Sequence, residues 1–186
     1  MRRGQLGYID TPAQGNVRPE GVAWAADNGC FGKGYPGDDA WLAWLAGMSP
    51  EGCLFAVAPD VVGDSEATWA RSAPMLPQIR ALGFPAALVA QNGIEDTEVQ
   101  WDAFDVLFIG GDTEWKLGKH ARHLIREAKR RGKWVHMGRV NSARRYRYAE
   151  HIGCDSADGT FLTFGPDANL PRLLSWQREP LIGADS

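Results

Sequence analysis

The sequence predicts an α/β fold of the (β/α)8 TIM-barrel type, small or partly trimmed. Short apolar runs alternate with helical stretches along the chain, which gives seven or eight strands. Most of these runs are continuously apolar, as is typical of parallel strands covered on both faces. Most also end in aspartate, glutamine or glycine, at the edge where such barrels carry active sites. The 186 residues fall below the ~200 of a full barrel, so we expect a trimmed form.

The alternation of predicted strands and helices also fits an open doubly wound sheet, but no glycine-rich nucleotide-binding loop follows the first predicted strand. Apolar runs predict strands at 6–9, 22–26, 54–58, 86–90 and 106–109. Periodicity, prolines and glycines predict helices at 38–46, 64–83 (broken at Pro74 and Pro77) and 119–131, and a partly helical link at 95–104. The stretch 133–160 predicts a strand, a helix and a second strand. The helix is capped by Asn141 or Ser142 and ends at Gly153. A short strand at 161–164 and a helix at 171–177 complete the prediction.

Composition narrows the class of protein to a single domain over residues 1–186, with 44% hydrophobic residues. No apolar run approaches the ~20 residues of a membrane span, and the first ten residues do not resemble a signal peptide. The three cysteines form no CxxC pair, so we expect neither a disulfide framework nor a zinc site. These features favour the reducing environment of the cytoplasm.

A basic block lies between Lys116 and Arg147. It holds twelve of the twenty Lys and Arg residues and a single acid, Glu127, although the net charge of the chain is −3. Trp115, Trp134, Tyr146 and Tyr148 flank or interrupt it. A charge run is usually a solvated helix face, but this block spans two helices and a strand, which favours an anionic partner such as nucleic acid. The candidate contacts are Lys119, Arg122, Arg126, Arg130, Arg139, Arg144 and Arg145.

Polar residues recur where the predicted strands end. Asp27, Asp60, Gln91, the Gly110-Gly111 pair and Asp158 all occupy such positions, and so does Asp155. A single aspartate there is more often a cap or turn residue, but the joint occurrence after successive strands favours one site. Carboxylates accept hydrogen bonds from the N–H groups that guanine presents, and glutamine or glycine N–H groups donate to its carbonyl. The set therefore suggests recognition of a purine edge.

Six segments in this order, over residues 22–160, resemble the tRNA-guanine transglycosylase superfamily, which exchanges guanine for a 7-deazaguanine in nucleic acid. They are DNGCF (27–31), LFAVAPD (54–60), VAQNG (89–93), GG (110–111), HMG (136–138) and GCDSAD (153–158). The resemblance maps the nucleophile to Asp158 rather than Asp155, and the second acid/base to Asp27. It implies a covalent aspartyl-glycosyl intermediate. The substrate-binding residues that it implies are Phe31, Asp60, Gln91, Gly110, Gly111 and Met137, with Phe31 and Met137 on the two sides of the base.

The departures from the family pattern bear on the substrate. The family's tRNA enzymes are about twice as long and carry a Cys3His zinc site that this sequence lacks. Asp112-Thr113-Glu114-Trp115 stands where the family has LAVGE, Asn28 replaces a serine, and Gly159 replaces a cysteine. A compact, zinc-free chain is similar to the phage and bacterial transglycosylases that modify DNA. We therefore expect DNA in preference to tRNA, a free 7-deazaguanine as second substrate, and neither metal nor cofactor.

Two other classes remain open at this point. A metal-dependent barrel hydrolase, such as a phosphodiesterase, could use Asp27, Asp60, His136 and Asp158 as ligands. Against it, the sequence has no HxH or HExxH pair, and the other three histidines fall on predicted helices. The third class is a non-catalytic nucleic-acid-binding domain. The eight tryptophans are compatible with a homodimer interface, and a short barrel leaves room for an accessory subunit.

Overall fold

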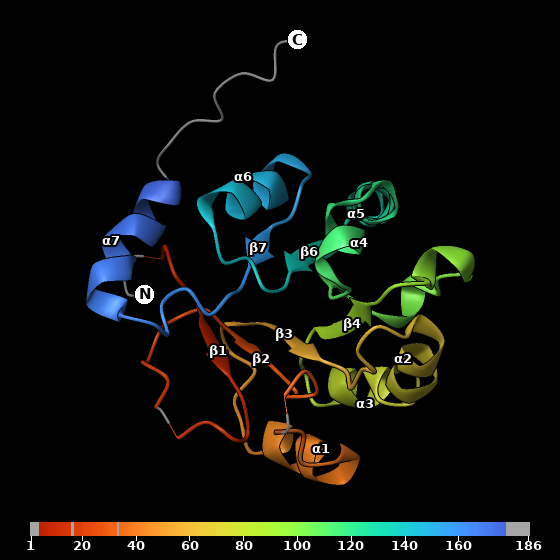
Figure 1. Ribbon diagram of the computed structural model, residues 1–186. Coiled ribbons are helices and arrows are strands. Elements are labelled where there is room, and N and C mark those ends of the chain that lie inside the picture. Colours follow the sequence, from red (N-terminus) through yellow and green to blue (C-terminus); the bar gives the residue numbers. More distant parts are fainter. Residues whose placement is uncertain (1–3, 16, 33, 178–186) are drawn as a thin grey trace.

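The computed structural model describes residues 4–15, 17–32 and 34–177, and its centre is one parallel sheet (Figure 1). Seven strands lie in the sheet in the order in which they occur along the chain, and each pairs in parallel with the next. They are β1 (Tyr8–Asp10), β2 (Trp24–Ala26), β3 (Cys53–Val57), β4 (Ala86–Ala90), β5 (Val106–Ile109), β6 (Trp134–Met137) and β7 (Ser156–Ala157). The bounds of β4 and β5 are those predicted from the apolar runs.

The helices lie around the outside of this curved sheet (Figure 1). They are α1 (Asp38–Ala46), α2 (Ser65–Ser72), α3 (Leu76–Ala81), α4 (Thr113–Leu117), α5 (Lys119–Arg130), α6 (Ala143–His151) and α7 (Pro166–Trp176), with short 3-10 turns at Ile94–Asp96 and Trp101–Ala103. Ser142 caps α6 by accepting the N–H of Arg145, whereas Asn141 accepts the N–H of Thr160. In the described ranges, none of these helices is long and apolar enough to cross a membrane.

The predicted (β/α)8 barrel is wrong, because the seven strands form a curled half-barrel that does not close. β1 and β7 are the two edges of the sheet. The expected strand at 161–164 is instead a turn in which the N–H of Thr163 bonds to Thr160, and β7 itself has two residues. The chain then enters α7. Trp176 of α7 packs against Phe161 and Tyr146, and Gln177 bonds to the carbonyl of Gln5 before β1.

The sheet separates two apolar layers because side chains alternate along each strand. The outer layer lies between sheet and helices and contains Leu107, Val135 and Met137. The inner layer lines the concave face with Ala25, Phe55, Val57, Ala87, Val89 and Val106. Continuing the alternation past the strand ends, Asp27 follows Ala25 and Gln91 follows Val89. The fold therefore directs these polar residues to the concave side, at the carboxyl edge of the sheet.

Candidate active site

Four of the predicted site residues come together at the carboxyl edge of the sheet. Asp27 follows β2, Asp60 follows β3, Gln91 follows β4 and Asp158 follows β7. Asp60 and Gln91 are hydrogen-bonded to each other, and the charges of Asp60 and Asp158 both act on Asp27. Strands far apart in sequence thus supply one cluster, because the carboxyl ends of parallel strands share an edge.

Asp158 is held as a carboxylate with one oxygen occupied. Its Oδ1 accepts the backbone N–H of Arg139 at 2.9 Å and lies 3.3 Å from Nε2 of His136. Burial acts to raise the pKa of Asp158. The hydrogen bond and charge of His136, the Arg139 N–H and the charge of Lys116 outweigh it, and the pKa lies below its usual value. Among the described residues no donor lies on Oδ2, so that oxygen is available to react.

His136 is oriented by a chain of polar contacts on the inner face. Trp134 Nε1 donates to Ser156 Oγ at 2.9 Å, and Ser156 Oγ lies 2.8 Å from His136 Nδ1. Nε2 of the same ring faces Asp158 Oδ1, so the contact on Nδ1 holds Nε2 in position to donate to that oxygen. Phe55 and Phe108 pack against the imidazole with ring centroids 4.9 and 4.6 Å away. The ring is thereby fixed as a donor to Asp158.

Asp27 differs from Asp158 in that its pKa is raised and not lowered. The one donor to its carboxyl in the described part of the chain is the N–H of Gly29, 2.7 Å from Oδ1. Burial, together with the charges of Asp158 and Asp60, raises the pKa of Asp27 above its usual value, against that hydrogen bond. Two neighbouring carboxyls whose pKa values are pushed in opposite directions are the usual sign of an acid paired with a nucleophile or base.

Asp60, Gln91 and Asn28 form a buried polar network beside the two carboxyls. Gln91 Nε2 donates to Asp60 Oδ2 at 2.8 Å, and Asn28 Nδ2 donates to Ala58 O at 2.8 Å and lies 3.4 Å from Asp60 Oδ1. Gln91 Oε1 accepts the N–H of Gly63. Burial raises the pKa of Asp60, against the bonds from Asn28 and Gln91. Both predicted base-reading side chains are thus fixed in place by protein partners.

Arg139 covers the predicted aromatic platform. Its guanidinium lies over the Phe31 ring, 4.5 Å from the centroid, and donates to the carbonyls of Gly110 and Gly111. Phe31 is 64% exposed. A Cβ on Gly110 would lie 2.5 Å from Val89 Cγ1 and 3.0 Å from Gln91 Nε2, so a side chain there would have to displace these two side chains. The predicted residues Phe31, Gly110 and Gly111 are thereby linked, through a planar cation.

Met137 lies away from this cluster. It is 2% exposed and belongs to the outer layer, because alternation along β6 turns it away from the face that His136 occupies. The predicted position of Met137 against a substrate ring is therefore replaced by a packing position between sheet and helices. Side chains one residue apart on a strand lie on opposite faces of the sheet. His136 is therefore the β6 side chain that reaches Asp158, and Met137 lies on the other face.

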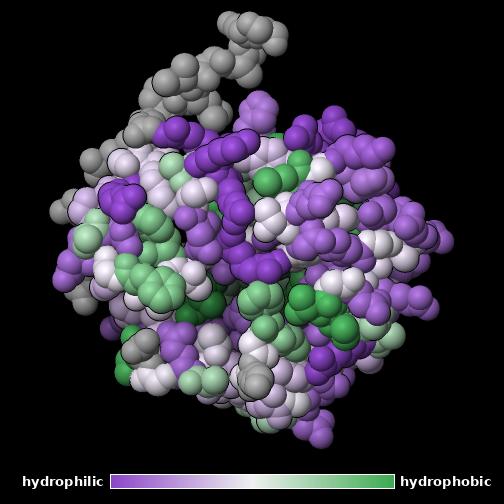
Figure 2. All heavy atoms as spheres, in the orientation of Figure 1, coloured by the Kyte–Doolittle hydropathy of each residue, from purple (hydrophilic) through white to green (hydrophobic). Residues whose placement is uncertain are grey.

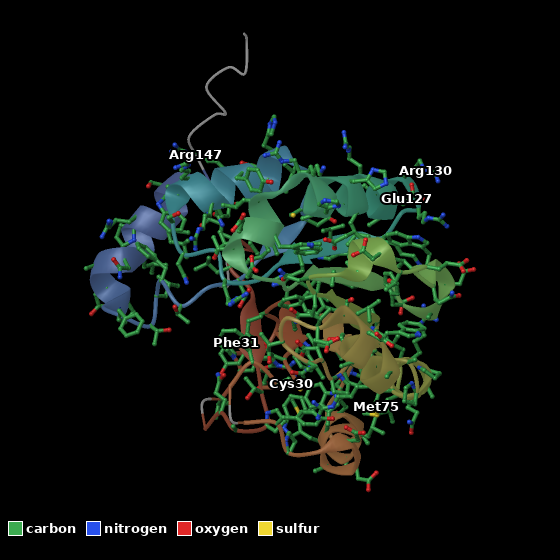
Figure 3. The ribbon with its side chains drawn as sticks, turned by 45° about the vertical axis from the view of Figure 1, so that its right-hand side comes forward. Cys30, Phe31, Met75, Glu127, Arg130 and Arg147 are labelled. Atoms are coloured by element: carbon green, nitrogen blue, oxygen red, sulfur yellow. The ribbon has the colours of Figure 1, made fainter. Side chains whose placement is uncertain are left out.

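The basic block divides into two parts. Arg139 and Arg145 are half-buried near the site, whereas Lys119, Arg122, Arg126, Arg130 and Arg144 are exposed. Arg130 pairs with Glu127 at 2.8 Å, and Figure 3 shows this pair well away from Phe31. Figure 2 shows hydrophilic residues gathered over the region of α5 and α6, with a hydrophobic area in the middle of the visible face.

The sequence patterns indicated no role in the site for Lys116 or Asn28, and they grouped His136 with Asp158 only in the metal-ligand alternative. Lys116 lies on α4, a helix that was not predicted, and its Nζ donates to Gly138 O at 2.6 Å. Asp112 caps this helix by accepting the N–H of Trp115, and an aspartate three residues before a buried tryptophan was a usable signal. Within the described ranges, no group of three or more His, Cys, Asp or Glu side chains is arranged to hold a metal ion.

No protein-family model matches the chain, and no curated protein matches it either. Among solved structures it is similar to the Amycolatopsis orientalis BexX/CysO complex, with a TM-score of 0.51 and 18% identity over 89% of this chain and 72% of that one. Lower scores relate it to two cyclic di-GMP complexes. The Klebsiella pneumoniae BlrP1 complex with calcium has TM-score 0.45 and 13% identity, over 75% of this chain and 38% of that one. The PaMucR phosphodiesterase complex with cyclic di-GMP has a TM-score of 0.44 and 14% identity, over 76% of this chain and 66% of that one. At these identities the similarity concerns the fold alone.

Proposed function

We propose that this chain is a base-exchange transglycosylase. It would replace guanine in nucleic acid, DNA in preference to tRNA, with a 7-deazaguanine through a covalent aspartyl-glycosyl intermediate. The observation that carries the proposal is the pairing of Asp158 with Asp27, whose pKa values are shifted down and up respectively. Relative to an ordinary aspartate, Asp158 favours the ionised form that attacks and Asp27 favours the protonated form that can act as an acid, which are the two forms that the first half of glycosyl transfer uses.

In the first half-reaction the target guanine is flipped into the site, at a cost of a few kcal/mol for unstacking. Asp158 Oδ2 attacks C1′ of the sugar and the C1′–N9 bond breaks. The bonding electrons leave with the guanine, and Asp27 transfers its proton to the departing base. His136 and the Arg139 N–H remain on Oδ1, so attack through Oδ2 breaks neither contact. The product is a glycosyl ester on Asp158 and a free guanine.

In the second half-reaction the incoming 7-deazaguanine takes the place of guanine. Asp27, now ionised, removes the proton from N9 while N9 attacks C1′, and the ester bond to Asp158 breaks. Both enzyme carboxyls return to their starting states. No net oxidation or hydrolysis occurs, and the two bases use one site in turn, which gives ping-pong kinetics.

The groups around the carboxyls fit recognition of a purine. Asp60 and Gln91 present an acceptor and a donor that are fixed against each other, at 2.8 Å. A base would stack on Phe31 once the Arg139 guanidinium leaves that ring. The cations of α5 and α6 would supply contacts to the phosphates of the nucleic acid, and the preference for DNA is carried over from the family resemblance.

Exchange of isotope-labelled guanine tests the reaction without knowledge of the natural 7-deazaguanine. The protein is incubated with DNA or tRNA and heavy-labelled guanine, and hydrolysed nucleosides are analysed by mass. The wild type should incorporate label, and Asp158→Ala should reduce incorporation to background. Asp155→Asn is the matched control, because Asp155 instead bonds to Lys129 and the N–H of Val135. It should retain exchange within a few-fold.

The natural substrate is then identified in cells that express the protein together with a 7-deazaguanine supply, with DNA and tRNA analysed separately. A deazaguanine nucleoside in DNA supports the whole proposal. The same nucleoside in tRNA alone keeps the chemistry and overturns the choice of polymer. Binding of nucleic acid with no exchange by the wild type, in vitro or in cells, would favour the non-catalytic class instead.

A further inference from the structure

Lys116 is a buried cation that the proposed reaction does not use. It lies on α4, is 4% exposed, and donates from Nζ to Gly138 O at 2.6 Å. Burying an ammonium costs several kcal/mol unless it is compensated, and a neutral donor could satisfy one carbonyl at lower cost. The position therefore calls for a reason beyond capping a carbonyl.

That reason lies on the other side of the same peptide group. The carbonyl of Gly138 and the N–H of Arg139 belong to one amide, and the Arg139 N–H donates to Asp158 Oδ1 at 2.9 Å. An ammonium on the oxygen polarises the amide and strengthens the N–H as a donor, because hydrogen bonds in series reinforce each other. The Lys116 ammonium, the Gly138–Arg139 peptide dipole and the Asp158 carboxylate are thus connected in series by two hydrogen bonds.

The peptide is held in place from several directions. Arg139 has φ 60°, the one non-glycine residue with positive φ in the described chain. A Cβ on Gly138 would lie 2.7 Å from Phe108 and 3.4 Å from Asp158 Oδ1, so the glycine lets this peptide approach the carboxylate. Val140 N–H donates to Asp158 O at 2.6 Å. The amide therefore has little freedom to turn away from Asp158.

We propose that Lys116 is a positioning residue that acts through the Gly138–Arg139 peptide to keep Asp158 ionised and its Oδ2 directed at the sugar. The role of Oδ2 rests on the proposed function, whereas the electrostatic link between Lys116 and Asp158 does not. The ammonium supplies charge to the nucleophile's surroundings without occupying either of its oxygens.

The charges around Lys116 set the pH at which the link operates. Burial, followed by the nearby guanidinium groups of Arg139 and Arg145, lowers the pKa of Lys116 to about 8, against Asp158 and Asp112. The ammonium is present below this pH and is lost above it. Around Asp158 itself the facing groups are His136, Lys116 and Asp27. Loss of the ammonium should weaken the Arg139 N–H bond and alter the environment of the Asp158 carboxyl.

The test follows the Asp158 side-chain carboxyl by NMR across pH in carbon-13-labelled protein. The wild type should show its own titration at low pH and a second, smaller inflection near pH 8. Lys116→Met and Lys116→Gln should both lose that second inflection and raise the Asp158 midpoint, although Gln retains a donor for Gly138. Asp27→Asn should keep the inflection. Arg131→Met removes an exposed cation at the far end of α5 and should change neither feature.

The outcomes separate the two proposals. An Asp158 midpoint and upper inflection that are unchanged in the Lys116 variants overturn the link, and Lys116→Gln carries the measurement if Lys116→Met does not fold. Exchange by Lys116→Met at neutral pH should fall by about tenfold to a hundredfold, the value of one charge-assisted hydrogen bond. If the wild type exchanges no base, the proposed function fails while the titration still decides the link.

Discussion

At the residue scale, the donors around Asp27 and Asp158 set the protonation of each. Burial acts in the same direction on both carboxyls, because it disfavours the ionised form of each, yet the pKa is raised for Asp27 and lowered for Asp158. Asp158 receives the Arg139 N–H and faces His136, whereas Asp27 has the Gly29 N–H and two acidic neighbours. The difference in pKa direction therefore comes from the groups that other strands bring, and the same residue type serves two roles.

The pH dependence of exchange should reflect both groups. For kcat/KM toward nucleic acid, Asp158 must be ionised, so activity falls as pH drops through its lowered pKa. Asp27 must be protonated, so activity falls as pH rises through its raised pKa. Asp27→Asn should slow exchange by roughly 10²- to 10⁴-fold and remove that alkaline limb. A profile measured from pH 3 to 9 that keeps the same limb in this variant would exclude Asp27 as the acid.

The sequence could locate these residues but not their partners. Asp27, Asp60 and Gln91 each follow an apolar run, which local patterns reveal, whereas Asp158 follows a short polar stretch and was located through the family segment GCDSAD. His136 and Asp158 are 22 positions apart, and their contact arises only when β6 pairs with β7. The choice of Met137 over its neighbour followed a family segment, whereas strand alternation turns the two side chains to opposite faces.

At the element scale, the loops after β6 and β7 pack without space for another atom. A Cβ on Gly159 would lie 2.5 Å from the carbonyl oxygen of Val140 and 2.4 Å from Asn141 Oδ1. Val140 also binds the backbone of Asp158 through its N–H. The contact between the two loops therefore fixes the residue next to the nucleophile, and glycine at 159 is required by close approach of backbone.

Gly159→Ala should separate these two loops. Overpacking of this kind typically costs about 1–3 kcal/mol of unfolding free energy, and displacement of Asp158 should reduce exchange further. Urea denaturation measures the first effect and labelled-guanine exchange the second. Gly15→Ala is the matched control, because a Cβ there meets nothing within 4 Å. Equal stability and activity of the two variants would show that the loops can part without loss.

The same scale explains the prediction that failed. Residues 161–164, Phe-Leu-Thr-Phe, have the composition of a strand. In the structure Phe161 packs against Trp176, with ring centroids 4.6 Å apart, and the backbone turns instead of extending β7 into a longer edge. Propensity was overridden by a contact with a helix that follows in the chain. The helix α4 was missed because its five residues are too few for a periodic pattern.

At the scale of the whole molecule, the open half-barrel is bridged by a helix where a full barrel would have another strand. Trp176 packs against Tyr146 of α6, and Gln177 reaches the backbone of Gln5 before β1. α7 thus contacts segments next to both edges of the sheet. The site carboxylates lie on the concave side at the carboxyl edge of the sheet. Helices α5 and α6 begin at this edge, so the distance of each cation from the site depends on its position along its helix.

The arrangement of cations predicts which of them bind nucleic acid. Arg144 and Arg145 lie in the first turn of α6, at the site edge, where the helix end also favours phosphate. Arg126 and Arg130 lie about 10 and 16 Å along α5 from its first residue, whereas the Debye length is about 10 Å. Arg130 is also paired with Glu127. Replacing the first pair with glutamine should weaken binding more than replacing the second.

Anisotropy titrations of a labelled single-stranded DNA at several salt concentrations measure this difference. Each phosphate contact contributes about 0.7 to the slope of log affinity against log salt for single strands. Loss of Arg144 and Arg145 should therefore reduce the slope by roughly 1 to 1.5, while loss of Arg126 and Arg130 should leave it nearly unchanged. Equal reductions would place the strand along the outer face of α5. A larger effect of the second pair would contradict binding at the carboxyl edge, because the flipped base must enter where Asp27 and Asp158 lie.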